Sequence, residues 1–162
     1  MQTIPEAVFD LIDREFNGKS WNGPSFMATL DKLSPTEAAS RATWEGYSAW
    51  EIANHCATCK LIMLTDLGQT LPEWPYDADK QFPAPTDVTS AAWERDKNLY
   101  SLIHARCLAT LRALSPEQLA QPMPTWKAPW LEIIVWLTTH DAFHGAQLRS
   151  MGLPTLKAKK HE

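Results

Sequence analysis

Apolar residues recur at helical intervals along much of this chain. The first segment shows the spacing of one buried helical face, with apolar side chains three or four residues apart at Val8, Leu11, Ile12 and Phe16. Four segments carry such a stripe: 5–16, 48–67, 88–114 and 129–152. A shorter one lies at 26–33. The pattern predicts an all-α protein, built as a four-helix bundle with no sheet.

The prolines mark where these helices can lie. Proline in a helix interior costs about 3 kcal/mol, so long helices are expected in the proline-free intervals. These intervals are 36–71, 86–115 and 130–153. The second helix also carries its own end signals, because Ser48 and Glu51 form a capping box and Gly68 can end the helix.

A long crossover loop is predicted between the second and third helices, over residues 69–87. It holds four prolines together with Trp74, Tyr76 and Phe82. A loop of this length is uncommon in a compact domain and is often functional. The alternative is a strap between helices, with its aromatic side chains packed on the bundle.

A short motif occurs twice. Ser-Pro pairs at 34–35 and 115–116 each favour a short helix start, and each is followed about ten residues later by a tryptophan, Trp44 or Trp126. Each copy then leads into a helix with an early Trp and Glu. If the echo is structural, it puts the helices of 48–67 and 129–152 in matching positions.

Composition narrows the class of protein and of partner. The 162 residues suit one domain, placed at 1–156, followed by a short basic tail at 157–162. The net charge is −4 without a basic stripe, so we expect no nucleic-acid partner. No apolar run approaches the roughly 20 residues that span a bilayer, so we expect no membrane partner. Three cysteines without an export signal indicate reduced thiols and a cytoplasmic protein.

Histidines in the last helix suggest a metal site. His140 and His144 lie one helical turn apart, so their rings point the same way and can reach one cation. The spacing matches that of zinc-binding helices, with Asp141 where the protease motif has Glu. His55 is the candidate third ligand, because the Ser-Pro echo would place it opposite this pair. A lone histidine on a buried stripe is, however, more often a structural residue.

The number of ligands decides between two kinds of site. Three imidazoles leave a coordination position open for substrate, whereas structural zinc sites close with four protein ligands. Cys59, one turn after His55, is the candidate fourth ligand, and Cys56 is the next. Asp141 either takes part in catalysis by accepting a proton or orients a ligand through a hydrogen bond. Glu51 could do the latter, but it already serves the helix cap. A peptidase is not expected, because no further ligand follows at a convincing distance.

Three stretches together resemble the DinB/YfiT-like family of metal-dependent proteins. They are Trp21-Asn22-Gly23-Pro24-Ser25, then Ser48-Ala49-Trp50-Glu51-Ile52 leading to His55, and His140-Asp141-Ala142-Phe143-His144 followed by Gln147-Leu148. The resemblance implies a four-helix bundle, often dimeric, with a long crossover after the second helix. It also implies that His55, His140 and His144 bind a divalent metal, zinc or nickel. The family commonly has Arg, Gly and Gln after its last histidine, where this chain has Gly145-Ala146-Gln147.

The resemblance and the open ligand set favour a metal-dependent enzyme acting on small molecules. Some relatives transfer low-molecular-weight thiols, so thiol S-transfer is the first expectation, with Trp74 and Tyr76 covering the electrophile. A metal-dependent hydrolase is the second, and a non-catalytic, metal-binding, stress-related bundle is the third. The eight tryptophans of the chain add the expectation of a homodimer, because such aromatic residues commonly supply core or dimer contacts.

Overall fold

The computed structural model describes residue 4 and residues 6–157, and the regular secondary structure of this part of the chain is all helix, with no strand. The predicted all-α class is therefore confirmed. The elements are α1 (Glu6–Phe16), α2 (Phe26–Leu30), α3 (Pro35–Ala38), α4 (Ala49–Asp66), α5 (Ser90–Arg112), α6 (Pro116–Leu119), α7 (Trp130–Ser150) and the 3-10 helix η1 (Pro154–Leu156). The predicted basic tail lies outside the described residues except for Lys157.

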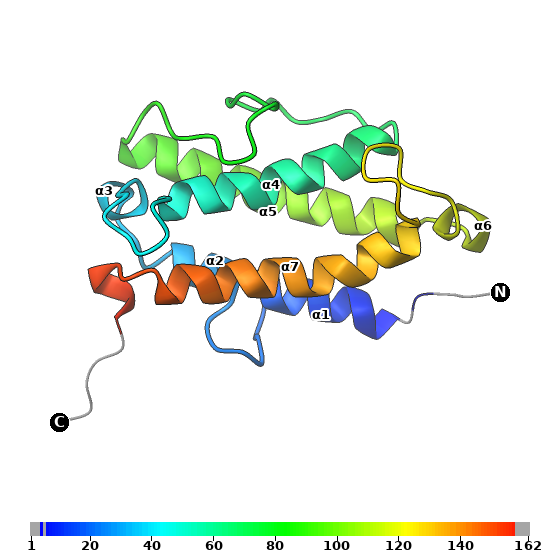
Figure 1. Ribbon diagram of the computed structural model, residues 1–162, viewed down its shortest axis with the longest axis horizontal. Coiled ribbons are helices and arrows are strands. Elements are labelled where there is room, and N and C mark those ends of the chain that lie inside the picture. Colours follow the sequence, from blue (N-terminus) through cyan, green and yellow to red (C-terminus); the bar gives the residue numbers. More distant parts are fainter. Residues whose placement is uncertain (1–3, 5, 158–162) are drawn as a thin grey trace.

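The four long helices form the bundle. α1 packs on α7, α4 packs on α5, and α4 meets α7 across the centre. Figure 1 shows that α4 and α5 run in the same direction, opposite to α1 and α7. A chain that links two parallel helices must travel back along their length, and residues 67–89 make that return without a helix of their own.

Local capping signals explain where the helices start. Ser48 Oγ accepts from the backbone N–H of Glu51 at 3.2 Å, and the Glu51 carboxylate accepts from the N–H of Ser48 at 2.9 Å. This reciprocal pair satisfies two of the free N–H groups at the start of α4. α2 ends at Leu30, three residues before the predicted end, because the chain turns there toward the Ser34 cap of α3.

The Ser-Pro echo is present as structure. Ser34 and Ser115 each cap a short helix, α3 or α6, through a side-chain oxygen that accepts a backbone N–H three residues later. α3 comes directly before α4, and α6 comes directly before α7. The two copies therefore introduce the two helices that carry the candidate ligands.

The crossover is tied to α4 and α5 by buried polar contacts. Asn54 Nδ2 donates to the carbonyl oxygen of Pro83 at 2.8 Å, and the Tyr76 hydroxyl donates to Asp96. Asp96 is itself buried and also accepts from Trp50 Nε1 at 2.8 Å. Because buried polar groups are costly to leave unpaired, these contacts fix the crossover along the bundle.

Candidate metal centre

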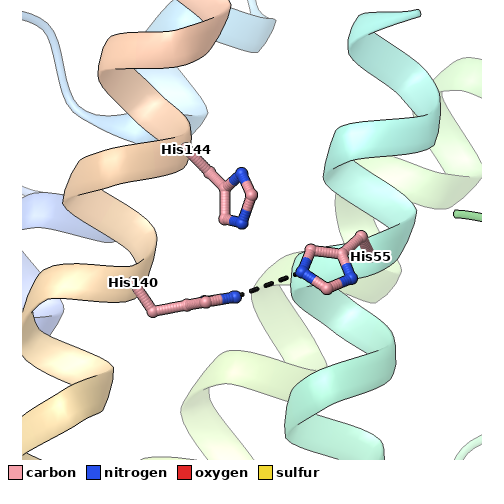
Figure 2. A group of neighbouring side chains, drawn as sticks. All are labelled: His55, His140 and His144. Carbon is pink, nitrogen blue, oxygen red and sulfur yellow. Dashed lines mark hydrogen bonds between the residues drawn. The ribbon is translucent and has the colours of Figure 1, made fainter. Parts of the chain in front are cut away.

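Three histidines meet between α4 and α7. His55 comes from α4, and His140 and His144 come from successive turns of α7 (Figure 2). The Nε2 atoms of His55 and His140 are 3.3 Å apart, and one ring nitrogen from each of the three lies within 4.8 Å of the others. All three side chains are buried, at 7% exposure each. The structure thus brings together the three residues that the sequence analysis selected.

Each imidazole is held from behind by an acceptor at its Nδ1. His55 Nδ1 donates to the carbonyl oxygen of Gln81 at 3.0 Å, and His140 Nδ1 donates to Asp141 Oδ1 at 3.3 Å. His144 Nδ1 donates to Gln147 Oε1 at 2.7 Å, and the Gln147 amide is oriented by its own donation to Glu45 at 3.0 Å. An acceptor at Nδ1 places the ring proton there and leaves Nε2 with a free lone pair.

The free nitrogens then face one another. The dashed line in Figure 2 joins Nε2 of His55 to Nε2 of His140, and both atoms are acceptors when each Nδ1 carries the proton. Two lone pairs directed at one place are unfavourable by themselves, and a shared cation satisfies both. Ligand nitrogens about 2.0–2.1 Å from a tetrahedral zinc ion lie about 3.3–3.4 Å apart, so the spacing fits such an ion.

Burial favours the neutral form of the His55 and His144 rings, the form that binds a metal. Desolvation, then the neighbouring His144 and His140, lowers the pKa of His55 to about 4. Desolvation also lowers the pKa of His144, although its hydrogen bond with Gln147 opposes the shift. A metal ligand must be the neutral imidazole, so at neutral pH no proton has to be removed from these two rings before an ion binds.

Cys59 lies beside the histidine group, close to His55. Its Sγ is 3.8 Å from His55 Nε2, but the group of mutually close ligand atoms contains the three histidines and not Cys59. Burial raises the pKa of its thiol to about 11, so the metal-free protein keeps it protonated. The structure therefore groups the three histidines as one candidate ligand set and places Cys59 beside it.

Asp141 lies at the Nδ1 side of His140, whereas the Nε2 side of that ring points to the other histidines. Its carboxylate is buried and accepts two hydrogen bonds from Lys60 Nζ, at 2.8 and 2.7 Å. Burial alone would raise the pKa of Asp141, but the Lys60 ammonium and the hydrogen bond with His140 hold it well below its usual range. Glu51 is engaged with Ser48 and Arg41 at the start of α4, as its cap role predicts, and not with a histidine.

Cys56 belongs to a second group of close ligand atoms, together with His140 and Asp141. Lys60 already places an ammonium group on Asp141, and this cation occupies the role that a metal would have there. Desolvation also raises the pKa of the Cys56 thiol well above its usual range. The tri-histidine group is therefore the better candidate for a metal.

A cavity of about 650 Å³ opens beside the histidines. His55, His140 and Cys59 form part of its wall. The rest of the wall comes from α4, the crossover, the loop before α7 and α7 itself. It combines the apolar side chains of Ile62, Ala78, Trp126, Ala128, Ile133 and Trp136 with the polar or charged ones of Thr58, Asp79, Lys80, Gln81 and Glu132. A concave surface that is largely apolar and carries several polar groups is typical of a small-molecule site.

The aromatic residues of this cavity differ from those expected. Trp74 packs near Tyr100, and Tyr76 donates to Asp96, so neither lines the cavity. Their place is taken by Trp126 and Trp136, whose rings meet edge to face at 5.3 Å, with Trp136 4.3 Å from the ring of His140. Trp126 carried a signal in the sequence echo, but nothing in the sequence tied it to the site.

Comparison with known sequences gives one match. A family model described as the DinB superfamily matches residues 21–148, a span that includes α2 to α6, nearly all of α7 and all three histidines. No curated protein and no solved structure matches the chain. Among the helices of the described residues, none is long and apolar enough to cross a membrane.

Proposed function

Because the chain belongs to the DinB superfamily, we propose that it is a metalloprotein in which His55, His140 and His144 hold one divalent ion. The observation that carries the proposal is the set of three imidazoles, each committed at Nδ1 and directed at a common point through Nε2. Imidazole nitrogen suits zinc and nickel, which are the proposed metals.

We propose that the site catalyses thiol S-transfer to a small electrophile. A divalent ion held by three neutral ligands keeps its full charge and so favours the thiolate form of a low-molecular-weight thiol. The thiol proton passes to solvent, the sulfur forms a bond to the electrophilic carbon, and the leaving group departs with its bonding electrons. Trp126, Trp136 and Ile133 would hold an apolar electrophile and exclude water from the reacting atoms. Asp141 is proposed to orient His140, because it accepts a hydrogen bond from His140 Nδ1 and does not line the cavity.

The alternative is a non-catalytic metal-binding bundle. The observation in its favour is Cys59, whose sulfur lies 3.8 Å from His55 Nε2 and would close the site if it became a fourth ligand. Cobalt-substituted protein separates the two cases, because a cysteine ligand adds a sulfur-to-cobalt charge-transfer band. Loss of such a band in Cys59→Ser would support the closed site, whereas its absence from the parent protein supports the open one.

Metal analysis tests the binding proposal. Protein purified without a histidine tag should bind one equivalent of zinc or nickel. His55→Ala and His144→Ala should each lose stoichiometric metal while keeping the helical circular dichroism of the parent. Full metal retention in both variants would show that these histidines are not the ligands.

A cosubstrate assay tests the reaction. Metallated protein is given an aromatic electrophile with glutathione, cysteine or bacillithiol, and both the product and the remaining thiol are measured. Metal-dependent consumption of thiol supports transfer. Ester turnover at the same rate with and without thiol would instead identify a hydrolase. No metal-dependent turnover by fully metallated protein would favour the non-catalytic alternative.

Two wider expectations accompany this function. The exposed outer side of α7 carries Val135 and Phe143, at 52% and 63% exposure, and we propose that a second copy of the chain covers it. The three cysteines are all free thiols in the structure, which supports the proposal of a reducing, cytoplasmic location.

A further inference from the structure

A buried ion pair stands directly behind the metal centre. Lys60 on α4 and Asp141 on α7 are each 1% exposed, and Lys60 Nζ donates to both carboxylate oxygens. Phe16 lies under the ammonium group, 4.8 Å from Nζ to the ring centroid. Lys60 does not line the cavity, so it has no direct contact with a substrate placed there.

Stability alone does not account for this pair. Removing two charges from water costs several kcal/mol per ion, and replacing a buried ion pair by well-packed apolar side chains is often neutral or stabilising. The immediate surroundings are largely apolar or weakly polar, with Phe16, Cys56, Cys107 and His104 nearby. Apolar side chains of similar volume would therefore fill this part of the core with equal or greater stability.

The pair is connected to the centre through one atom. Asp141 Oδ1 accepts from Lys60 Nζ at 2.8 Å and from His140 Nδ1 at 3.3 Å. The other oxygen also accepts from Lys60, at 2.7 Å, and His104 Nδ1 lies 3.9 Å from it without a hydrogen bond. Lys60 is thus the group that fixes the carboxylate plane, and the carboxylate in turn fixes the ring of His140.

We propose that Lys60 is a positioning residue of the metal centre. Its ammonium group holds Asp141 in place, Asp141 holds the Nδ1 proton of His140, and Nε2 of His140 is thereby presented to the ion. The inference rests on the proposed tri-histidine site and adds a residue that touches neither metal nor substrate. Hydrogen-bond partners behind metal-binding histidines commonly change metal affinity by 10–100-fold, and the same range is expected here.

Four variants test the connection. Lys60→Met removes the ammonium group, Asp141→Asn removes the carboxylate, and the double variant removes both. Lys97→Met is the matched control, because Lys97 is also a mostly buried lysine, but it pairs with the exposed carboxylates of Asp31 and Glu94 and not with Asp141. Zinc affinity is measured by chelator competition. The tautomer of His140 is read in the metal-free protein from imidazole nitrogen shifts, which a purely structural lysine would not change.

The expected result is a loss of zinc affinity of about 10–100-fold in Lys60→Met, with a mixed tautomer at His140. The double variant should be no worse than Asp141→Asn, because Lys60 acts only through Asp141. Lys97→Met should match the parent. An unchanged tautomer and a zinc affinity within about twofold of the parent in Lys60→Met would overturn the proposal, as would multiplying losses in the double variant.

Two further measurements keep the test decisive. If Lys60→Met does not fold, Lys60→Met combined with Asp141→Leu replaces the whole pair with apolar side chains and should restore folding. It should still show the mixed His140 tautomer, and a parent-like tautomer would overturn the proposal. If the parent protein binds no metal, the metal function fails, but the tautomer measurement in metal-free protein still tests the role of Lys60.

Discussion

The depressed pKa of His55 predicts how metal binding responds to acid. A free imidazole has a pKa of about 6.5, so at pH 5.5 roughly nine-tenths of it is protonated and proton competition weakens binding about 11-fold. With a pKa of about 4, His55 is only a few per cent protonated at pH 5.5 and costs almost nothing in affinity. Lowering the pH from 7.5 to 5.5 should therefore leave His55 a competent ligand.

The lowered pKa of His55 also determines the direction in which the stability of the protein changes with pH. Burial and the neighbouring histidines disfavour the charged ring in the folded protein, so between pH 6.5 and pH 4 the unfolded chain binds a proton that His55 does not. The stability of the metal-free protein is unaffected by this group above pH 6.5. It falls as the pH drops through this window toward 4.

The assay follows the ring carbon and proton resonances of His55 in metal-free protein from pH 7.5 to pH 4, assigned by comparison with His55→Gln. A histidine-containing peptide in the same buffers provides the reference midpoint. The expected midpoint for His55 lies near pH 4, whereas that of the reference lies near pH 6.5. A midpoint between pH 6 and 7 would refute the reasoning, because it would show that the ring is not desolvated by its surroundings.

Three further predictions concern stability and assembly. Ser48→Ala removes the capping box of α4 and should lower the free energy of unfolding by about 1 kcal/mol in urea denaturation; an unchanged midpoint would count against the cap. His104→Leu should raise it by roughly 1 kcal/mol, because both buried ring nitrogens lack a hydrogen-bond partner among the described residues; a clear loss of stability would contradict this. Val135→Glu with Phe143→Glu should shift sedimentation to a monomer without loss of helix, and a persisting dimer would exclude this surface as the interface.

The features that the sequence could predict are local ones. The capping box at Ser48 and Glu51 depends on residues three apart, and the spacing of His140 and His144 depends on a single helical turn. The position of His55 opposite that pair could not be predicted from local spacing. It was predicted from the Ser-Pro echo and the family resemblance. Both signals concern arrangement along the chain, so they could be read before any contact was known.

The features that could not be predicted depend on contacts between distant segments. Lys60 is a charged residue in an apolar helix, and only the position of Asp141, 81 residues later, makes it part of the site. Gln81 holds His55 through a backbone carbonyl, which has no side-chain signature. Trp74 and Tyr76 were misplaced because composition alone does not say which side of a crossover faces the centre.

The distribution of the three histidines over the bundle has a consequence for the lifetime of the protein. His55 lies on α4, which follows the first Ser-Pro motif, and His140 and His144 lie on α7, which follows the second. An ion bound by all three would therefore cross-link the N-terminal and C-terminal halves of the chain. A ligand that binds only the folded state adds about 2.7 kcal/mol when its free concentration is one hundred times its dissociation constant. Metal supply would then set how often the halves separate, and with it how readily a protease can reach the chain.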